Sequence, residues 1–154
     1  MSLERLGIED FRCIERADLE FDLRCNLISG QNASGKTSLL EAIFFLGRGR
    51  SFRTNRSDTL VRAETRQFTL TGRIDTSGVS QPIGMRVTSE GIEARFAGRA
   101  VSGLAELATR LPVQAIDPEV HRLVDGGPQE RRRYLDWGVF HVEPRFVDHW
   151  RRYQ

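Results

Sequence analysis

The sequence contains very little lysine and very little cysteine. Of its 23 lysine and arginine residues only Lys36 is a lysine, which singles out that position. The two cysteines, Cys13 and Cys25, are too few for a disulfide framework and fit a reducing compartment. We expect each to be a small buried apolar residue, because neither they nor the three histidines show a metal-ligand spacing.

Long apolar runs and a strong net charge are also absent. No stretch approaches the roughly 18 apolar residues of a membrane-spanning helix, and the N-terminus shows no signal-peptide pattern. We therefore expect a soluble, cytoplasmic protein. The formal net charge of +2 is too small to indicate nucleic-acid binding by itself. A length of 154 residues fits one domain.

The single lysine lies inside a complete phosphate-binding motif. Residues 30–37 read Gly-Gln-Asn-Ala-Ser-Gly-Lys-Thr and match the P-loop pattern G-x-x-x-x-G-K-[ST]. The backbone N–H groups of such a loop surround phosphates and leave room for a compact ammonium group but not for the planar fork of arginine. We therefore predict a site for ATP and Mg²⁺, with the hydroxyl group of Thr37 on the metal. Its predicted residues are Gly30, Gln31, Asn32, Ala33, Ser34, Gly35, Lys36, Thr37 and Ser38.

The segments on either side of the motif support this prediction. The apolar run from Cys25 to Ser29 predicts a buried strand that leads into the loop. After Lys36 the apolar residues recur at helical spacing, which predicts a helix that ends near Gly47. The N-terminus of that helix would face the phosphates. Ser38 either contacts the α-phosphate or lies on the helix surface.

The remaining sequence predicts an antiparallel sheet and further helices. Two strands are expected on either side of Arg12, and three alternating segments between residues 68 and 96 predict a meander. The arginine-rich segment from Arg48 to Arg66 has no period and predicts a loop with short helical pieces. Helices are expected over 101–111, 128–140 and 144–153, with a short strand over 111–116 and a turn or short helix from Pro118.

This order of elements predicts an α/β fold of the P-loop NTPase class. A meander directly after the P-loop helix is typical of the first lobe of an ABC-type ATPase head, with a mixed sheet around that helix. Residues 1–117 are expected to form lobe I with the Walker A motif, and 118–154 the start of a helical lobe II.

The elements needed for hydrolysis are not found. No run of four apolar residues ends in Asp or Glu after the P-loop, and the nearest approach, Val113–Asp117, is followed at once by a proline. We therefore do not expect Asp117 to be the Walker B acid that holds the metal. No L-S-G-G-like signature is present. We expect an N-terminal portion of a longer protein, one that binds ATP, contains no catalytic residue that the sequence identifies and does not turn ATP over.

Several motifs together resemble the RecF family of replication and recombination-repair proteins. Met1–Leu3, Asp10–Arg12 and Gly30–Ile43 resemble the family's opening, and Gly49–Arg53 its G-[RK]-S-F-R element. Residues 123–136 resemble its more restrictive G-x-P-x-x-R-R-x-[FY]-L-D signature. One departure is Ala33, where glycine is commoner.

The resemblance implies an ATP-dependent clamp. ATP would drive two heads together as a homodimer that grips double-stranded DNA near single-strand gaps, acts with RecR and RecO to load RecA, and feeds the SOS response. The family is implied to be a weak ATPase. Gln114 lies at the position of the Q-loop residue, which would face the γ-phosphate and Mg²⁺; it could equally be an ordinary strand residue.

Other readings of the arginines and of the whole chain stay open. Arg12 and Arg53 could contact the nucleotide or be solvated surface residues. Arg131, Arg132 and Arg133 would point in three directions on a helix, about 100° apart, so they could contact DNA or another lobe, with at least one in a structural ion pair. A structural head of SMC or Rad50 type is the alternative function. A small-molecule kinase is disfavoured by the meander.

Overall fold

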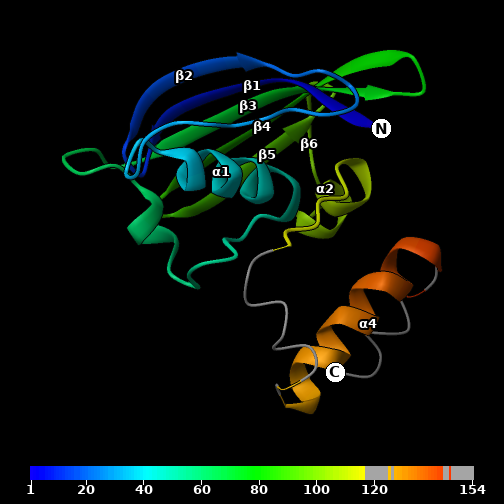
Figure 1. The fold of residues 1–154 in the computed structure, drawn as a ribbon. Coiled ribbons are helices and arrows are strands. Elements are labelled where there is room, and N and C mark those ends of the chain that lie inside the picture. The colour runs from blue at the N-terminus through cyan, green and yellow to red at the C-terminus, as the bar shows by residue number, and fades with distance from the viewer. Residues whose placement is uncertain (117–124, 126, 144–145, 147–154) are drawn as a thin grey trace. The chain divides into compact units, whose positions relative to one another are not determined.

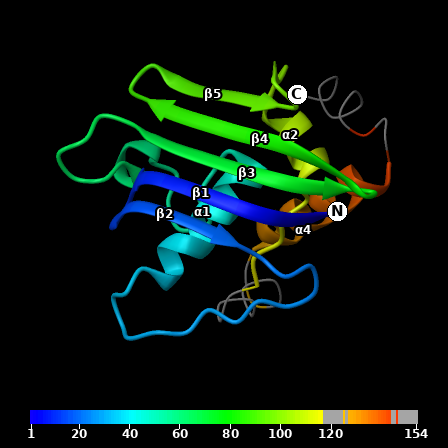
Figure 2. The same cartoon turned by 90° about the horizontal axis from the view of Figure 1, so that it is seen from above.

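The structure is a computed structural model that describes residues 1–116, 125, 127–143 and 146. The chain divides into two units, Met1–Val113 and Gln114–Gln154. The first unit is built on one six-stranded sheet with the order β2-β1-β3-β4-β5-β6 (Figures 1 and 2). Its strands are β1 (Ser2–Phe11), β2 (Ile14–Glu20), β3 (Phe68–Thr76), β4 (Val79–Thr88), β5 (Gly91–Phe96) and β6 (Arg99–Ala100).

Strict alternation of side chains creates one buried and one exposed face of this sheet. In β3, Leu70 and Ile74 are fully buried, whereas Thr71 and Arg73 between them are exposed. Successive side chains of a strand point to opposite faces, so each strand contributes a full row to the core. Helices α1 (Lys36–Arg48) and α2 (Leu104–Arg110) lie behind the sheet in Figure 2, on its buried face.

The core joins the first strand, the P-loop helix and the third strand through aromatic rings. The rings of Phe11 and Phe68 pack edge to face with centroids 5.0 Å apart, and Phe45 of α1 lies 5.3 Å from Phe68. These three side chains are essentially inaccessible to solvent. The helix that follows the P-loop is therefore fixed to the sheet by its buried face.

The structure confirms the two strands predicted on either side of Arg12, which form a hairpin, and the predicted meander. The strands β1 and β2 pair antiparallel through Phe11 and Ile14, and β3, β4 and β5 pair in sequence order. The arginine-rich segment is a loop with one short 3₁₀ helix, η1 (Ser57–Leu60). The predicted helix over 101–111 is α2.

Three local predictions are wrong. Cys25–Ser29 forms no strand, both cysteines are exposed, and Leu27 has 91% of its surface accessible. A strand needs hydrogen-bonding neighbours and cover on its faces, and no described strand lies beside this segment. The third wrong prediction is the strand over residues 111–116, which form none. The described strand pairings are all antiparallel.

The P-loop helix ends one residue after the predicted glycine. Gly47 lies inside α1, and Gly49 is the C-cap, with a left-handed φ of 63° and its N–H donating to the carbonyl of Phe45. Gly47 has a packing role instead. A Cβ atom there would lie 2.6 Å from the carbonyl oxygen of Leu111.

The second unit is described chiefly by one helix. Helix α4 (Pro128–Val142) confirms the predicted helix and begins with Pro128 in its first turn, where a missing N–H costs nothing. The predicted turn at Pro118, Asp117 and the helix over 144–153 lie outside the described residues, apart from Phe146. None of the described helices is long and apolar enough to cross a membrane.

Candidate nucleotide-binding site

The P-loop wraps through left-handed backbone conformations before α1 begins. Gly30 and Gly35 have φ angles of 155° and 91°, and Ala33 has 63°. A Cβ atom on Gly30 would approach the hydroxyl of Ser34 to 2.9 Å. Glycine adopts such angles without steric cost, whereas alanine at a left-handed position carries strain. The two motif glycines are thus required by the loop's own shape.

The loop delivers its backbone amides to the N-terminus of α1. Gly35 is the N-cap, no side chain caps the helix, and its first turn holds no acidic residue. The N–H groups of a first helical turn have no partner within the helix, and the helix dipole favours an anion there. Such a helix N-terminus favours a bound anion.

Lys36 lies across the loop that precedes it. Its Nζ donates to the carbonyl oxygens of Gly30 at 2.8 Å and Gln31 at 2.6 Å. The ammonium group is therefore held over the concave side of the loop, where a phosphate chain would pass. Thr37 is exposed, so its hydroxyl is accessible to a metal ion, whereas Ser38 is only 7% exposed. Ser38 is therefore not on the exposed surface of the helix, and its hydroxyl lies 3.4 Å from the Cys13 sulfur.

A buried carboxylate lies one turn further along the same helix. Glu41 is fully buried and accepts a bidentate pair from Arg12, with Nε–Oε2 at 3.0 Å and Nη2–Oε1 at 2.9 Å. The Ser51 hydroxyl also donates to Oε1, and Nη1 of Arg53 lies 3.6 Å from Oε2. These four residues are called the Glu41 cluster below.

The Glu41 cluster ties two segments to the P-loop helix, the β1–β2 turn and the arginine-rich loop. Arg12 stands at the β1–β2 turn with a left-handed φ of 56°, and its Nη1 donates to the Thr59 carbonyl at 3.0 Å. The Ser51 oxygen accepts the backbone N–H groups of Arg53 and Thr54. Arg12 is thus not a freely solvated residue. Its paired guanidinium fixes the turn, the arginine-rich loop and α1 to one another.

The end of α1 carries a second group of arginine and aromatic contacts. The Arg48 guanidinium lies 5.7 Å from the centroid of the Phe44 ring, which packs edge to face on Phe52. The pKa of Arg48 is lowered to about 10, first because burial disfavours the charged form and second because Arg50 repels it. Arg48 therefore packs with the core rather than reaching freely into solvent.

The other predicted site residues belong to the second unit. Gln114 is its first residue and is exposed. Arg131 and Arg132 lie on α4 and are both exposed, and Arg133 belongs to the same helix.

Sequence reasoning missed Glu41 as a member of the site. Helical spacing could have shown that Glu41 lies on the buried face of α1. Glu41 falls on the same face as Ser38, Ala42 and Phe45, which are all buried. A carboxylate on a buried face requires charged or hydrogen-bonding partners, and the arginines of the neighbouring loops are such partners.

The P-loop turns at two glycines and leads into helix α1, which packs on one face of an antiparallel sheet. This combination defines the first lobe of an ABC-type ATPase head. The chain belongs to the RecF/RecN/SMC N terminal domain family, whose model matches residues 2–119.

Individual relatives support this placement. The chain is 45% identical over 153 residues to the DNA replication and repair protein RecF of Psychromonas ingrahamii, which covers 99% of this chain and 43% of that protein. A solved structure of the recombination mediator protein RecF with ATP superposes with a TM-score of 0.82 at 29% identity, covering 93% of this chain and 39% of that one. A structure from work on ATP-driven dimerisation of SMC ATPases has a TM-score of 0.68 at 20% identity, covers 89% of this chain and 99% of that one, and shows the shared fold. The chain thus spans less than half the length of the curated relative.

Proposed function

We propose that this chain is the ATP-binding portion of a RecF-type protein that acts in DNA replication and recombinational repair. The observation that carries the proposal is the P-loop itself, with its left-handed glycines, its amides at the start of α1 and Lys36 across its concave side. The similarity to RecF, including a structure with ATP, supports it.

The proposed site assigns a separate task to each group. Lys36 would exchange its two loop carbonyls for the β- and γ-phosphates, because a phosphate chain offers it a full counter-charge. The exposed Thr37 hydroxyl would bind Mg²⁺, which would neutralise phosphate charge. Gln114 would approach the same metal and the γ-phosphate in the assembled head. The fold of residues 1–117 would serve as lobe I, and 118–154 would begin lobe II.

The complete protein would work as a clamp. ATP would bring two heads together as a homodimer on double-stranded DNA at single-strand gaps, in concert with RecR and RecO, to load RecA and feed the SOS response in the cytoplasm. Arg131, Arg132 and Arg133 would contact DNA or another lobe. The similarity to a RecF structure from the RecFOR pathway supports this part of the proposal.

The second candidate is a structural head of the SMC or Rad50 kind. The fold shared with an SMC ATPase favours it, and the two candidates differ in the segment expected beyond residue 154. A long heptad-repeat coiled coil would indicate the structural head, and a short helical lobe the RecF type.

The functional test is ATP-dependent DNA binding by the complete protein. Duplex DNA with a single-strand gap is titrated with and without Mg-ATP, for the wild type, Lys36→Met and Arg66→Met. Arg66→Met removes one positive charge from an exposed position of the loop before β3 and serves as the matched control. We expect ATP to tighten binding for the wild type and the control but not for Lys36→Met. Equal affinity with and without ATP in the wild type would contradict the clamp.

A further inference from the structure

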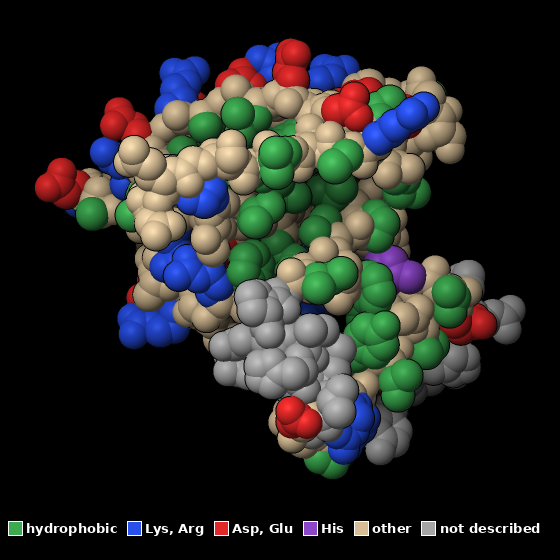
Figure 3. Space-filling view, in the orientation of Figure 1, with side chains coloured by type: hydrophobic (Ala, Val, Ile, Leu, Met, Phe, Trp, Pro, Cys, Tyr) green, Lys and Arg blue, Asp and Glu red, His purple; other side chains and the backbone are tan. Residues whose placement is uncertain are grey.

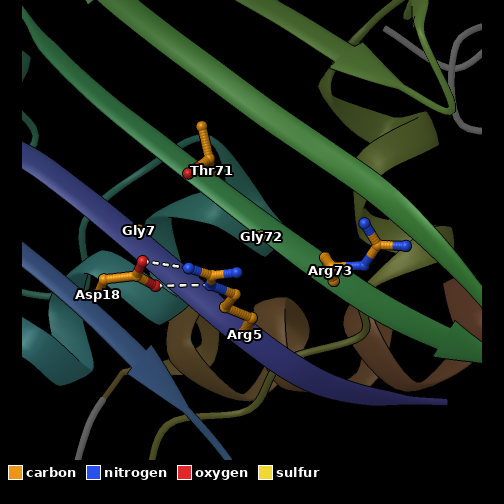
Figure 4. A pocket seen from close by; sticks show the side chains of 6 residues that line it. All are labelled: Arg5, Gly7, Asp18, Thr71, Gly72 and Arg73. Carbon is orange, nitrogen blue, oxygen red and sulfur yellow. Dashed lines mark hydrogen bonds and ion pairs between the residues drawn. The ribbon is translucent and has the colours of Figure 1, made fainter.

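The exposed face of the sheet carries a pocket that contains none of the predicted site residues. It lies over strands β1, β2 and β3 and has a volume of about 240 Å³ (Figure 4). Its lining residues are Arg5, Gly7, Asp18, Thr71, Gly72 and Arg73. Helices α1 and α2 of the first unit cover the opposite face, so in this unit the pocket opens to solvent.

Two arginines at this pocket are paired in register on neighbouring strands. Arg5 of β1 is paired with Arg73 of β3, and both side chains are exposed on the same face. Like charges directly opposite on neighbouring strands destabilise a sheet. This pair needs negative charge nearby, which Asp18 supplies to Arg5 directly and Glu4 supplies to Arg73 through Ser80.

Each guanidinium is held from its outer side and keeps further donors. Nε of Arg5 donates to Oδ1 of Asp18 at 2.7 Å, and Nη2 donates to Oδ2. Nε of Arg73 donates to the Ser80 hydroxyl at 3.1 Å, which in turn donates to Glu4. A guanidinium has five N–H donors, so these bonds orient both groups without using all of them. In Figure 4 the Arg5 side chain extends toward Asp18, and the Arg73 side chain extends in the opposite direction, away from Arg5 and Asp18.

The floor of the pocket depends on a glycine. A Cβ atom on Gly7 would lie 2.4 Å from the hydroxyl oxygen of Thr71, its cross-strand partner. The Thr71 hydroxyl therefore sits directly over the Gly7 backbone, two residues along the strands from the Arg5–Arg73 pair. The lining holds two guanidinium groups and the Asp18 carboxylate, and the Glu4 carboxylate accepts from Ser80 beside Arg73. The guanidinium N–H groups that these bonds leave unused, together with the Thr71 hydroxyl, suit a tetrahedral oxyanion.

We propose that this pocket binds one phosphate group of a nucleic-acid backbone, an assignment that rests on the DNA binding proposed above. Arginine and threonine side chains are common partners of backbone phosphates. The rest of the exposed face is mixed rather than basic. Exposed Arg86 stands between Glu93 and Thr69 in register, and in Figure 3 blue and red side chains lie next to each other along the upper border. The face therefore offers a single phosphate seat and not a broad basic patch.

The test compares the salt dependence of duplex-DNA binding by the complete protein with Mg-ATP. One phosphate contact contributes close to one unit to the slope of log affinity against log salt. Arg73→Gln should therefore reduce the slope by about one unit, and the control Arg66→Gln should leave it unchanged. Gly7→Ala, which removes no charge but displaces the Thr71 hydroxyl, should weaken binding as well.

The outcomes separate this inference from the proposed function. A wild type that binds DNA with ATP, together with an Arg73→Gln slope equal to that of the wild type, overturns the phosphate seat and leaves the clamp intact. A wild type that does not bind DNA overturns both. A second arm titrates inorganic phosphate and follows the backbone amide of Thr71 by NMR. Saturable shifts there, with no change in the DNA slope of Arg73→Gln, would assign the pocket to free anions and refute the nucleic-acid seat.

Discussion

Replacing Glu41 by alanine should destabilise the first unit strongly although Glu41 lies outside the P-loop motif. The carboxylate is fully buried and serves Arg12, Arg53 and Ser51 at once. Removing one partner of a buried ion pair costs about 3–5 kcal/mol, because the other charge stays in place without its counter-charge. The Arg12 and Arg53 side chains are 22% and 49% exposed. Water can reach them in part, so we expect the lower end, about 3 kcal/mol.

The assay is urea unfolding of the chain for the wild type, Glu41→Ala and the matched control Asp18→Ala. Asp18 also forms a bidentate pair with an arginine, but that pair is half exposed, and exposed pairs contribute little to stability. Arg12→Met with Glu41→Leu removes both charges together and should recover most of the loss. If Glu41→Ala lowers the free energy of unfolding no more than Asp18→Ala does, the Glu41 cluster does not hold the segments together.

Three further predictions concern the loop, the exposed ion pair and turnover. Ala33→Gly should stabilise the chain by about 0.5 kcal/mol in the same unfolding assay, because relief of the left-handed strain slightly exceeds the added entropy of an unfolded glycine; a loss of stability would refute the strain. The pKa of Asp18 should lie below its ordinary value of 3.8, chiefly because Arg5 donates hydrogen bonds to the carboxylate. The small stabilisation from this ion pair is therefore complete above pH 3.8 and is lost as the pH falls through the lowered pKa. NMR titration should show the ordinary pKa of Asp18 restored in Arg5→Gln. The chain should release phosphate from ATP no faster than Lys36→Ala, since none of its residues is identified as the metal-binding acid or as a group that orients water; faster steady-state release would make Asp117 a candidate.

The five longer strands could be predicted from the sequence because each alternates apolar and polar residues, whereas the pairing of β1 with β3 could not. The alternation of Leu70 and Ile74 with Thr71 and Arg73 indicates a strand with one buried and one exposed face. Its neighbours β1 and β4 are both within the described residues. The P-loop could be predicted because its glycines and Lys36 are demanded by local geometry and charge.

Other features depend on contacts that are distant in sequence. The apolar run Cys25–Ser29 has strand composition, but composition supplies no neighbour to pair with. Arg12 and Glu41 are 29 residues apart, and local spacing cannot show which arginine meets a buried carboxylate. Gly47 resembles a helix stop, yet it is held inside α1 by close packing against Leu111. In each case tertiary contact outweighs the local signal.

The most direct test of the central claim is calorimetric titration of the chain with Mg-ATP. We predict weak but saturable binding by the wild type and by Arg66→Met, and none by Lys36→Met, because the ammonium group over the loop is the counter-charge of the phosphates. Absence of heat from the wild type up to millimolar ATP, or equal binding by Lys36→Met, would contradict a nucleotide site at Gly30–Thr37.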